Sequence, residues 1–150
     1  DEATRRATAR ALLGRIRVML GGRAAEKVVY GETTTGAESD IQQLTRISRS
    51  MVGRWGMSDA IGAVAVAHTD GAGPLLPGVS ETSEHTQQVV DEEVRRIVDE
   101  AERQTIDLLE RERERLESLA QALLEHETLD QDEAYAAAGV EPLLPTAPVA

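Results

Sequence analysis

Apolar residues recur at steps of three and four along most of this 150-residue chain, and this spacing constrains its fold more than any other feature. Such steps place apolar side chains on one face of an α-helix, whereas a half-buried strand would require strict alternation. The helical spacing is present in four stretches, at residues 7–20, 41–55, 90–109 and 116–124. We therefore predict an all-α domain with one short extended segment and a long C-terminal helical hairpin.

Glycine and polar residues predict the helix boundaries in the first third of the chain. Gly21-Gly22 weakens the first helix, which should resume over residues 23–30 and stop at a left-handed Gly31. Ser39 or Asp40 is the predicted N-cap of the second helix, because short polar side chains accept hydrogen bonds from the first free N–H groups. The first third is thus predicted to hold two or three helices.

The remainder of the chain is predicted to contain a linker and the longest helix. The second helix should end near Gly56, and Ile61–Ala67 reads equally well as a brief strand or an extended buried segment. Residues 69–80, rich in Gly and Pro, form a predicted mobile loop. From Ser83 a long helix is followed by a second one, as a hairpin or a bent continuation.

The C-terminal end is predicted to hold one further short helix. It spans residues 130–138 and stops at Gly139, and the tail at 141–150 is expected to be disordered. The predicted organisation is therefore one domain over residues 1–140 followed by that tail.

Composition excludes several classes of function. The absence of cysteine excludes disulfide scaffolds, thiolate metal sites and cysteine nucleophiles. A net charge of −11 argues against nucleic acid as a partner, since binding requires Lys and Arg to neutralise phosphates. No apolar run reaches 18 residues, so neither a membrane span nor a signal peptide is expected. The acidity is concentrated in residues 81–150, which hold 19 Asp and Glu against 6 Arg.

Few single residues indicate chemistry by themselves. His68, His85 and His126 lie too far apart to form a helical metal-binding pair, and each is interpreted as a solvated side chain, with stray metal binding at His68 or His85 a minor hypothesis. The many carboxylates of the acidic half alternate with Arg, which favours a solvated face with i, i+4 ion pairs over catalysis. Asp40 differs because it follows a Thr-Thr-Gly-Ala loop and starts a helix. By position alone, an N-cap is favoured over a metal ligand.

A series of short motifs, read together, changes that interpretation. They cover about residues 10 to 135 in one order, and they resemble the peptidase domain of FtsH, a membrane-anchored AAA+ zinc metalloprotease. The motifs are Gly21-Gly22-Arg23-Ala24-Ala25-Glu26, Val29-Tyr30-Gly31-Glu32, Thr34-Thr35-Gly36-Ala37 with Asp40-Ile41, Met51-Val52, Trp55-Gly56-Met57-Ser58 with Gly62, Val90-Asp91-Glu92-Glu93-Val94-Arg95-Arg96-Ile97, Leu123-Leu124-Glu125 and Glu127-Thr128-Leu129-Asp130.

The resemblance implies a zinc site. In that family a His-Glu-x-x-His helix supplies two zinc ligands and the general base, and an aspartate after the Thr-Thr-Gly-Ala loop completes the site. Asp40 matches this aspartate and becomes the expected third ligand. Glu26 is expected to support the site by holding a ligand imidazole, although a structural ion pair with Arg23 or Lys27 fits equally well.

The resemblance also implies a larger enzyme around this chain. The family uses ATP in an upstream AAA+ module, assembles as a hexameric ring, is anchored to the cell membrane with its catalytic parts on the cytoplasmic face, and degrades unfolded or membrane proteins in protein quality control. No His-Glu-x-x-His occurs in this sequence, so no general base and no catalytic residue is assigned within it, and the membrane and ATP-binding segments are expected upstream. The isolated chain is therefore expected to be inactive.

Three accounts of such a chain remain open. It is a fragment of an FtsH-type protease, or a catalytically silent relative that acts as a scaffold, or a helical interaction module without a link to proteolysis. Upstream coding for His-Glu-x-x-His would identify the first account, and self-association would separate the second from the third.

Overall fold

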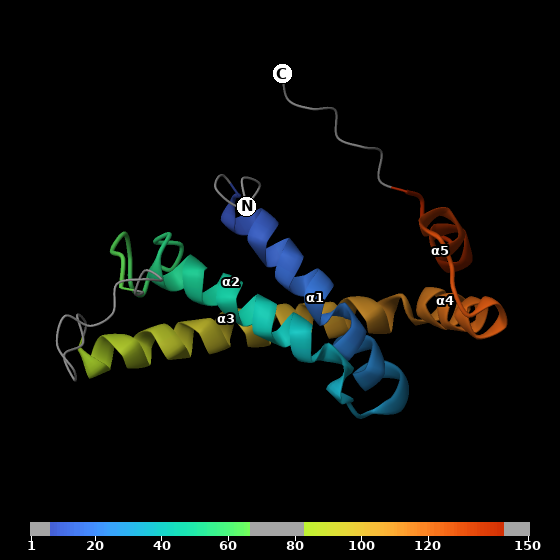
Figure 1. Cartoon of the computed structure of the whole chain (residues 1–150), viewed down its shortest axis with the longest axis horizontal. Coiled ribbons are helices and arrows are strands. Elements are labelled where there is room, and N and C mark those ends of the chain that lie inside the picture. Colours follow the sequence, from blue (N-terminus) through green and yellow to red (C-terminus); the bar gives the residue numbers. More distant parts are fainter. Residues whose placement is uncertain (1–6, 67–82, 143–150) are drawn as a thin grey trace, which may run out of the picture. The chain divides into compact units, whose positions relative to one another are not determined.

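The computed structural model describes residues 7–66 and 83–142, and every regular element in these two ranges is a helix, without a strand. The predicted all-α fold is confirmed. None of the helices in these two ranges is long and apolar enough to cross a membrane. Figure 1 shows the elements, which are α1 (Ala9–Tyr30), the 3-10 turn η1 (Thr35–Ala37), α2 (Glu38–Gly53), α3 (Glu84–Arg111), α4 (Arg113–His126) and α5 (Gln131–Ala138).

The packing divides the chain into two compact units, Asp1–Ile106 and Asp107–Ala150, called the first and second units here. In the first unit, α1, α2 and most of α3 meet around one apolar core (Figure 1). Each helix presents residues spaced by three or four to this core, as the sequence predicts. The core residues are Leu12, Ile16, Leu20, Leu44, Ile47, Met51, Val52, Val90, Val94, Ile97 and Ala101.

Helix α1 is continuous through Gly21-Gly22, so the predicted weakness there is wrong. Burial of Ile16, Leu20 and Ala24 on one face of the helix outweighs the conformational entropy that two glycines cost. The end of the helix was predicted correctly. Gly31 is left-handed, with φ of 73°, and its N–H donates to the carbonyl of Lys27 at 3.0 Å.

Helix α2 starts earlier than predicted, and neither Ser39 nor Asp40 is its N-cap. The turn η1 runs directly into the helix at Glu38, so Asp40 is the third helical residue. A side-chain cap is present instead at the start of η1, where Thr34 Oγ1 accepts a hydrogen bond from the Gly36 N–H at 3.3 Å. The helix ends at Gly53 rather than near Gly56.

Residues 54–66 form an irregular connection in place of the predicted brief strand or buried segment. Gly56 has φ of 63°, a conformation that favours glycine, and a Cβ there would lie only 3.1 Å from Ala63 Cα, a tight contact with backbone. Val64 is 59% exposed, and the segment is tied back to α2 by Val66 N–H, which donates to the Gly53 carbonyl at 2.7 Å. The predicted mobile loop at 69–80 lies outside the described residues.

Helix α3 follows the predicted pattern up to the boundary of the first unit. Ser83 Oγ accepts from the Thr86 N–H at 3.1 Å and so caps its start. Val90, Val94, Ile97, Ala101 and Thr105 are buried, and Val98 packs against the core. The same face continues to Leu108, but that side chain is 49% exposed.

The second unit contains a helical hairpin made by α4 and α5, and Glu112 alone separates α4 from α3. Ser118 Oγ of α4 donates to the Ala137 carbonyl of α5 at 2.7 Å. The predicted last helix is confirmed. Asp130 and Glu133 form a reciprocal capping box at its start, and Gly139, with φ of 66°, ends it. Within the predicted tail, residues 143–150 lie outside the described part of the chain.

Candidate functional site

Asp40 lies in the first turn of α2, in register with the residues that face the core. Leu44, Ile47 and Met51 follow it at steps of four, three and four, and these side chains are at most 9% exposed. Asp40 itself is exposed, and its carboxylate makes no hydrogen bond or ion pair with any residue that the structure describes. The buried face of α2 therefore ends in an open, unpaired carboxylate.

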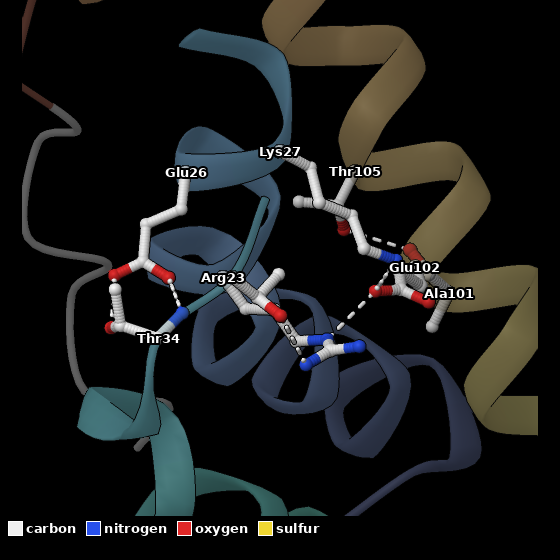
Figure 2. A network of polar contacts seen from close by, with 8 residues as sticks. Arg23, Glu26, Lys27, Thr34, Ala101, Glu102 and Thr105 are labelled. Carbon is white, nitrogen blue, oxygen red and sulfur yellow. Dashed lines mark hydrogen bonds and ion pairs between the residues drawn. The ribbon is translucent and has the colours of Figure 1, made fainter. Parts of the chain in front are cut away.

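The segment before α2 is held by Glu26, which projects from α1 (Figure 2). Its Oε2 accepts from the Thr34 backbone N–H at 2.9 Å, and its Oε1 accepts from the Thr34 hydroxyl at 2.8 Å. The backbone N–H, then the hydroxyl, and more weakly the charge of Arg23 lower the pKa of Glu26 against the opposing effect of burial. Thr34 in turn accepts from the Gly36 N–H, so hydrogen bonds connect Glu26 to the first turn of η1.

A second group of side chains joins α1 to α3 next to the Glu26–Thr34 contact (Figure 2). Glu102 Oε1 accepts from Arg23 Nε at 3.0 Å and from Lys27 Nζ at 2.8 Å. Burial raises the pKa of Glu102, but the hydrogen bonds and charges of Lys27 and Arg23 outweigh it, so the net shift is downward. In the structure Arg23 and Lys27 form their ion pairs with Glu102, so the alternative for Glu26, an ion pair with Arg23 or Lys27, stays a prediction.

A third polar cluster links the connection after α2 to α3. Buried Ser58 donates its hydroxyl to Glu93 Oε2 at 2.5 Å, and Arg96 contacts both oxygens of Glu93, at 2.9 and 3.1 Å. The Arg96 and Ser58 hydrogen bonds lower the pKa of Glu93, with burial opposing them. This cluster, like Glu102, is absent from the sequence-based candidates. Of these contacts, only the i, i+3 spacing of Glu93 and Arg96 could have been read from the sequence.

The donor atoms near Asp40 fit one ligand of a zinc site and no more. Zinc accepts carboxylate oxygen and requires four donors, three of them from protein in catalytic sites. Asp40 has both oxygens free, whereas those of Glu26 are engaged by Thr34. No group of three or more His, Asp or Glu that could hold a metal ion exists among residues 7–66 and 83–142.

The histidines do not supplement this donor set in the part of the chain that is described. His85 lies in the first turn of α3 and His126 at the end of α4, and His68 falls outside the described residues. The other carboxylates of the acidic half mostly follow the predicted solvated pattern, for example in the Arg113–Glu117 pair at 3.0 Å. Asp40 thus stays the candidate ligand, as an exposed carboxylate in the first turn of α2 on the side that faces the core.

The sequence pattern of peptidase family M41 matches residues 1–136 of this chain. The chain belongs to peptidase family M41. An M41 protein of Conexibacter woesei, named ATP-dependent zinc metalloprotease FtsH 3, is 62% identical over 136 residues, which are 91% of this chain and 18% of that protein. The predicted resemblance to FtsH is confirmed.

Further FtsH proteins match over similar ranges. That of Nitrosococcus oceani is 47% identical over 79% of this chain and 19% of its own length, and that of Thermobaculum terrenum is 46% identical over 84% and 20%. Both are named ATP-dependent zinc metalloproteases. This M41 chain spans about a fifth of the length of the curated relatives it matches.

Proposed function

We propose that this M41 chain supplies one of three protein ligands, Asp40, to the catalytic zinc ion of an ATP-dependent endopeptidase. The observation that carries the proposal is the position of Asp40, which is exposed and unpaired where the core-facing side of α2 ends. An acidic residue that merely capped the helix would lie at its N-cap and bond to its N–H groups. Asp40 lies three residues past the N-cap, Ala37, where its oxygens are available to a cation.

The other donors are proposed to come from outside this chain, as two imidazoles and a glutamate in a His-Glu-x-x-His helix. This sequence contains no such motif, so the chain alone is proposed neither to hold catalytic zinc nor to cut peptides. When bound, zinc lowers the pKa of a coordinated water so that a nearby carboxylate can deprotonate it for attack on a peptide carbonyl. The contribution of this chain is a fixed carboxylate in the zinc coordination shell.

Glu26 is proposed to support the site by fixing the backbone ahead of Asp40. Its two hydrogen bonds to Thr34 hold the residue that precedes η1. Ala37, the last residue of that turn, is buried. A metal ligand must be held to within a fraction of an ångström, so the segment before it is as important as the ligand itself. A further hydrogen bond from a ligand imidazole to Glu26 stays a prediction.

The parent protein is proposed to be a membrane-anchored protease of FtsH type. It uses ATP in a separate module, assembles as a hexameric ring at the cytoplasmic face of the membrane, and degrades unfolded or membrane polypeptides. The named FtsH relatives support the zinc protease and its ATP dependence.

A second candidate role, as an assembly module without catalysis, has one observation in its favour. The second unit carries a largely apolar groove of about 360 Å³, lined in part by Leu108, Leu116, Leu119 and Val140. An open apolar surface of this kind is typical of contact with another protein. The two roles differ in whether Asp40 is needed for metal binding.

Zinc stoichiometry tests the proposal directly. Elemental analysis is made on this chain and on a longer polypeptide that includes the His-Glu-x-x-His helix, and about one zinc ion per chain is expected only in the longer form. Asp40→Asn in the longer form should lower zinc affinity by more than about 100-fold, since even residues that merely orient ligands contribute 10- to 100-fold. In the full enzyme, which includes the ATPase module, the same substitution should sharply lower proteolysis while ATP hydrolysis is largely retained.

Glu38→Gln is the matched control, because Glu38 lies in the same first turn of α2 and undergoes the same loss of charge. It should leave zinc occupancy unchanged. Full zinc affinity and activity in Asp40→Asn would remove Asp40 from the site and favour the assembly role. Stoichiometric zinc in the short chain would instead require a metal site of its own.

A further inference from the structure

Glu102 stands out because it is the carboxylate of α3 that reaches α1, while its neighbours on α3 pair locally or face solvent. Its side chain is 19% exposed, and one oxygen, Oε1, receives donors from both Arg23 and Lys27. Charge-assisted hydrogen bonds of this length are strong when partly shielded from water. Glu102 therefore restrains the C-terminal half of α1 at two points, one turn apart.

The same stretch of α1 carries the side chains that hold the segment before α2. Arg23, paired with Glu102 through Nε, donates a hydrogen bond from Nη1 to the Thr33 hydroxyl at 3.4 Å. Glu26, between Arg23 and Lys27 in sequence, holds Thr34 through both of its oxygens. Contacts thus connect α3 to α1, α1 to residues 33 and 34, and Thr34 to Gly36 in η1. Figure 2 shows the contacts of Glu102 with α1 and of Glu26 with Thr34.

We propose that Glu102 is a positioning residue for Asp40. By fixing Arg23 and Lys27, it sets the rotation of the last turns of α1, and these turns place Thr33 and Thr34 and hence the first turn of α2. This inference rests on the proposed function only in giving Asp40 a ligand role. The mechanical link between Glu102 and Thr34 exists independently of zinc.

The apolar core does not supply this restraint by itself. The buried positions of α1 end at Ala24, two residues before Glu26, so the last turn of the helix lies beyond the packed face. Apolar packing is non-directional, whereas an ion pair to two donors defines a direction. The Glu102 contacts therefore fix the part of α1 that the core leaves least constrained.

Hydrogen exchange in the present chain tests the mechanical link. In Glu102→Gln, the Thr34 amide should exchange about tenfold faster by NMR, the equivalent of weakening one hydrogen bond to a charged group. The Ile97 amide, in the middle of α3, serves as the reference for global unfolding and should change much less. In the longer zinc-binding polypeptide, the same variant should raise the zinc dissociation constant, measured by chelator competition, about tenfold, as expected for a residue that orients a ligand.

Two variants control the experiment. Glu100→Gln removes another carboxylate of α3, and the contacts of Glu100, to Arg96 and Gln104, stay within that helix. This variant should leave Thr34 exchange and zinc affinity unchanged. Arg23→Lys keeps a cation near Glu102 but removes the reach to Thr33. It should accelerate Thr34 exchange with little loss of stability, so it carries the test if Glu102→Gln does not fold.

Each outcome decides between the inference and the proposed function. Unchanged Thr34 exchange in Glu102→Gln and Arg23→Lys overturns the positioning role, whatever zinc does. Faster exchange with unchanged zinc affinity, in a protein where Asp40→Asn loses zinc, also overturns it. If Asp40→Asn keeps zinc, the proposed function fails, and the positioning of a metal ligand fails with it even where the Thr34 link is present.

Discussion

The two units of this M41 chain are both helical but differ in what stabilises them. All of the buried core residues belong to the first unit, where α1, α2 and α3 enclose them. In the second unit α4 and α5 contain no buried residue, and Leu124 is 79% exposed. Its helices depend on local hydrogen bonds and a capping box, which are worth far less than a packed core.

The charge distribution follows the same division. Residues 107–142 hold 11 Asp and Glu against 3 Arg, and the ion pairs within these residues, such as Arg113–Glu117, join residues three or four positions apart in the chain. In the first unit, ion pairs also connect different helices, as between Glu102 and α1. The candidate metal ligand Asp40 therefore belongs to the first unit, whose packed core can hold a side chain in one position.

The largest expected difference between the units is in the free energy of unfolding lost when one leucine in each unit is replaced by alanine. Leu44→Ala removes a side chain that is 2% exposed and should lower the free energy of unfolding by about 2–5 kcal/mol. Leu124→Ala removes one that is 79% exposed and should change it by less than about 0.5 kcal/mol. Trp55, the single tryptophan, lies in the first unit and reports its unfolding by fluorescence during urea denaturation.

Circular dichroism on the same samples sharpens the test. Because it reports helix in both units, part of its signal should be lost before the Trp55 transition if the second unit unfolds separately. Coincident transitions, or a large loss of stability in Leu124→Ala, would contradict the difference between the units.

A smaller effect is expected from the cap of α5. Asp130→Ala removes the acceptor for the Glu133 N–H, which is one half of the capping box, and should destabilise α5 by about 1 kcal/mol. The change should appear as faster hydrogen exchange of the Glu133 amide, with Ile97 unaffected. Asp132→Ala, in the same turn without the capping contact, is the matched control. Equal effects of the two variants would mean that charge at the helix start, rather than the cap, stabilises α5.

The smallest expected effect is on the pH dependence of the first unit. The pKa values of Glu93 and Glu102 are lowered in the folded chain from an ordinary value of 4.5. A lowered pKa contributes stability that is present above pH 4.5 and is lost as the pH falls through the folded-state pKa. The urea midpoint of the Trp55 signal should therefore fall on acidification below that pH. The loss should be modest, because these groups retain contact with water.

Glu102→Gln should weaken this acid dependence, whereas Glu100→Gln should leave it in place. Urea titrations of the two variants between neutral and acidic pH provide the measurement. An unchanged slope in Glu102→Gln would mean that other carboxylates account for the acid sensitivity.

Much of the fold was predictable because apolar periodicity reports which face of a helix is buried. Gly31 and Gly139 end helices as predicted, since a left-handed residue there favours glycine. The errors arose where tertiary contacts outweigh local preference. Gly21-Gly22 does not interrupt α1, and the start of α2 is set by a contact from Glu26 to Thr34 that no local rule contains.

The sequence alone determined the helical class, the helix faces, the FtsH resemblance and the choice of Asp40, because periodicity and ordered motifs are properties of the chain itself. Only the tertiary structure decided that Asp40 is exposed, that Glu26 engages Thr34, and that Glu102 receives both Arg23 and Lys27. Glu102 lies 75 residues from Lys27 in the chain. Contacts over such separations depend on how three helices pack around a common core, and no local pattern encodes that arrangement.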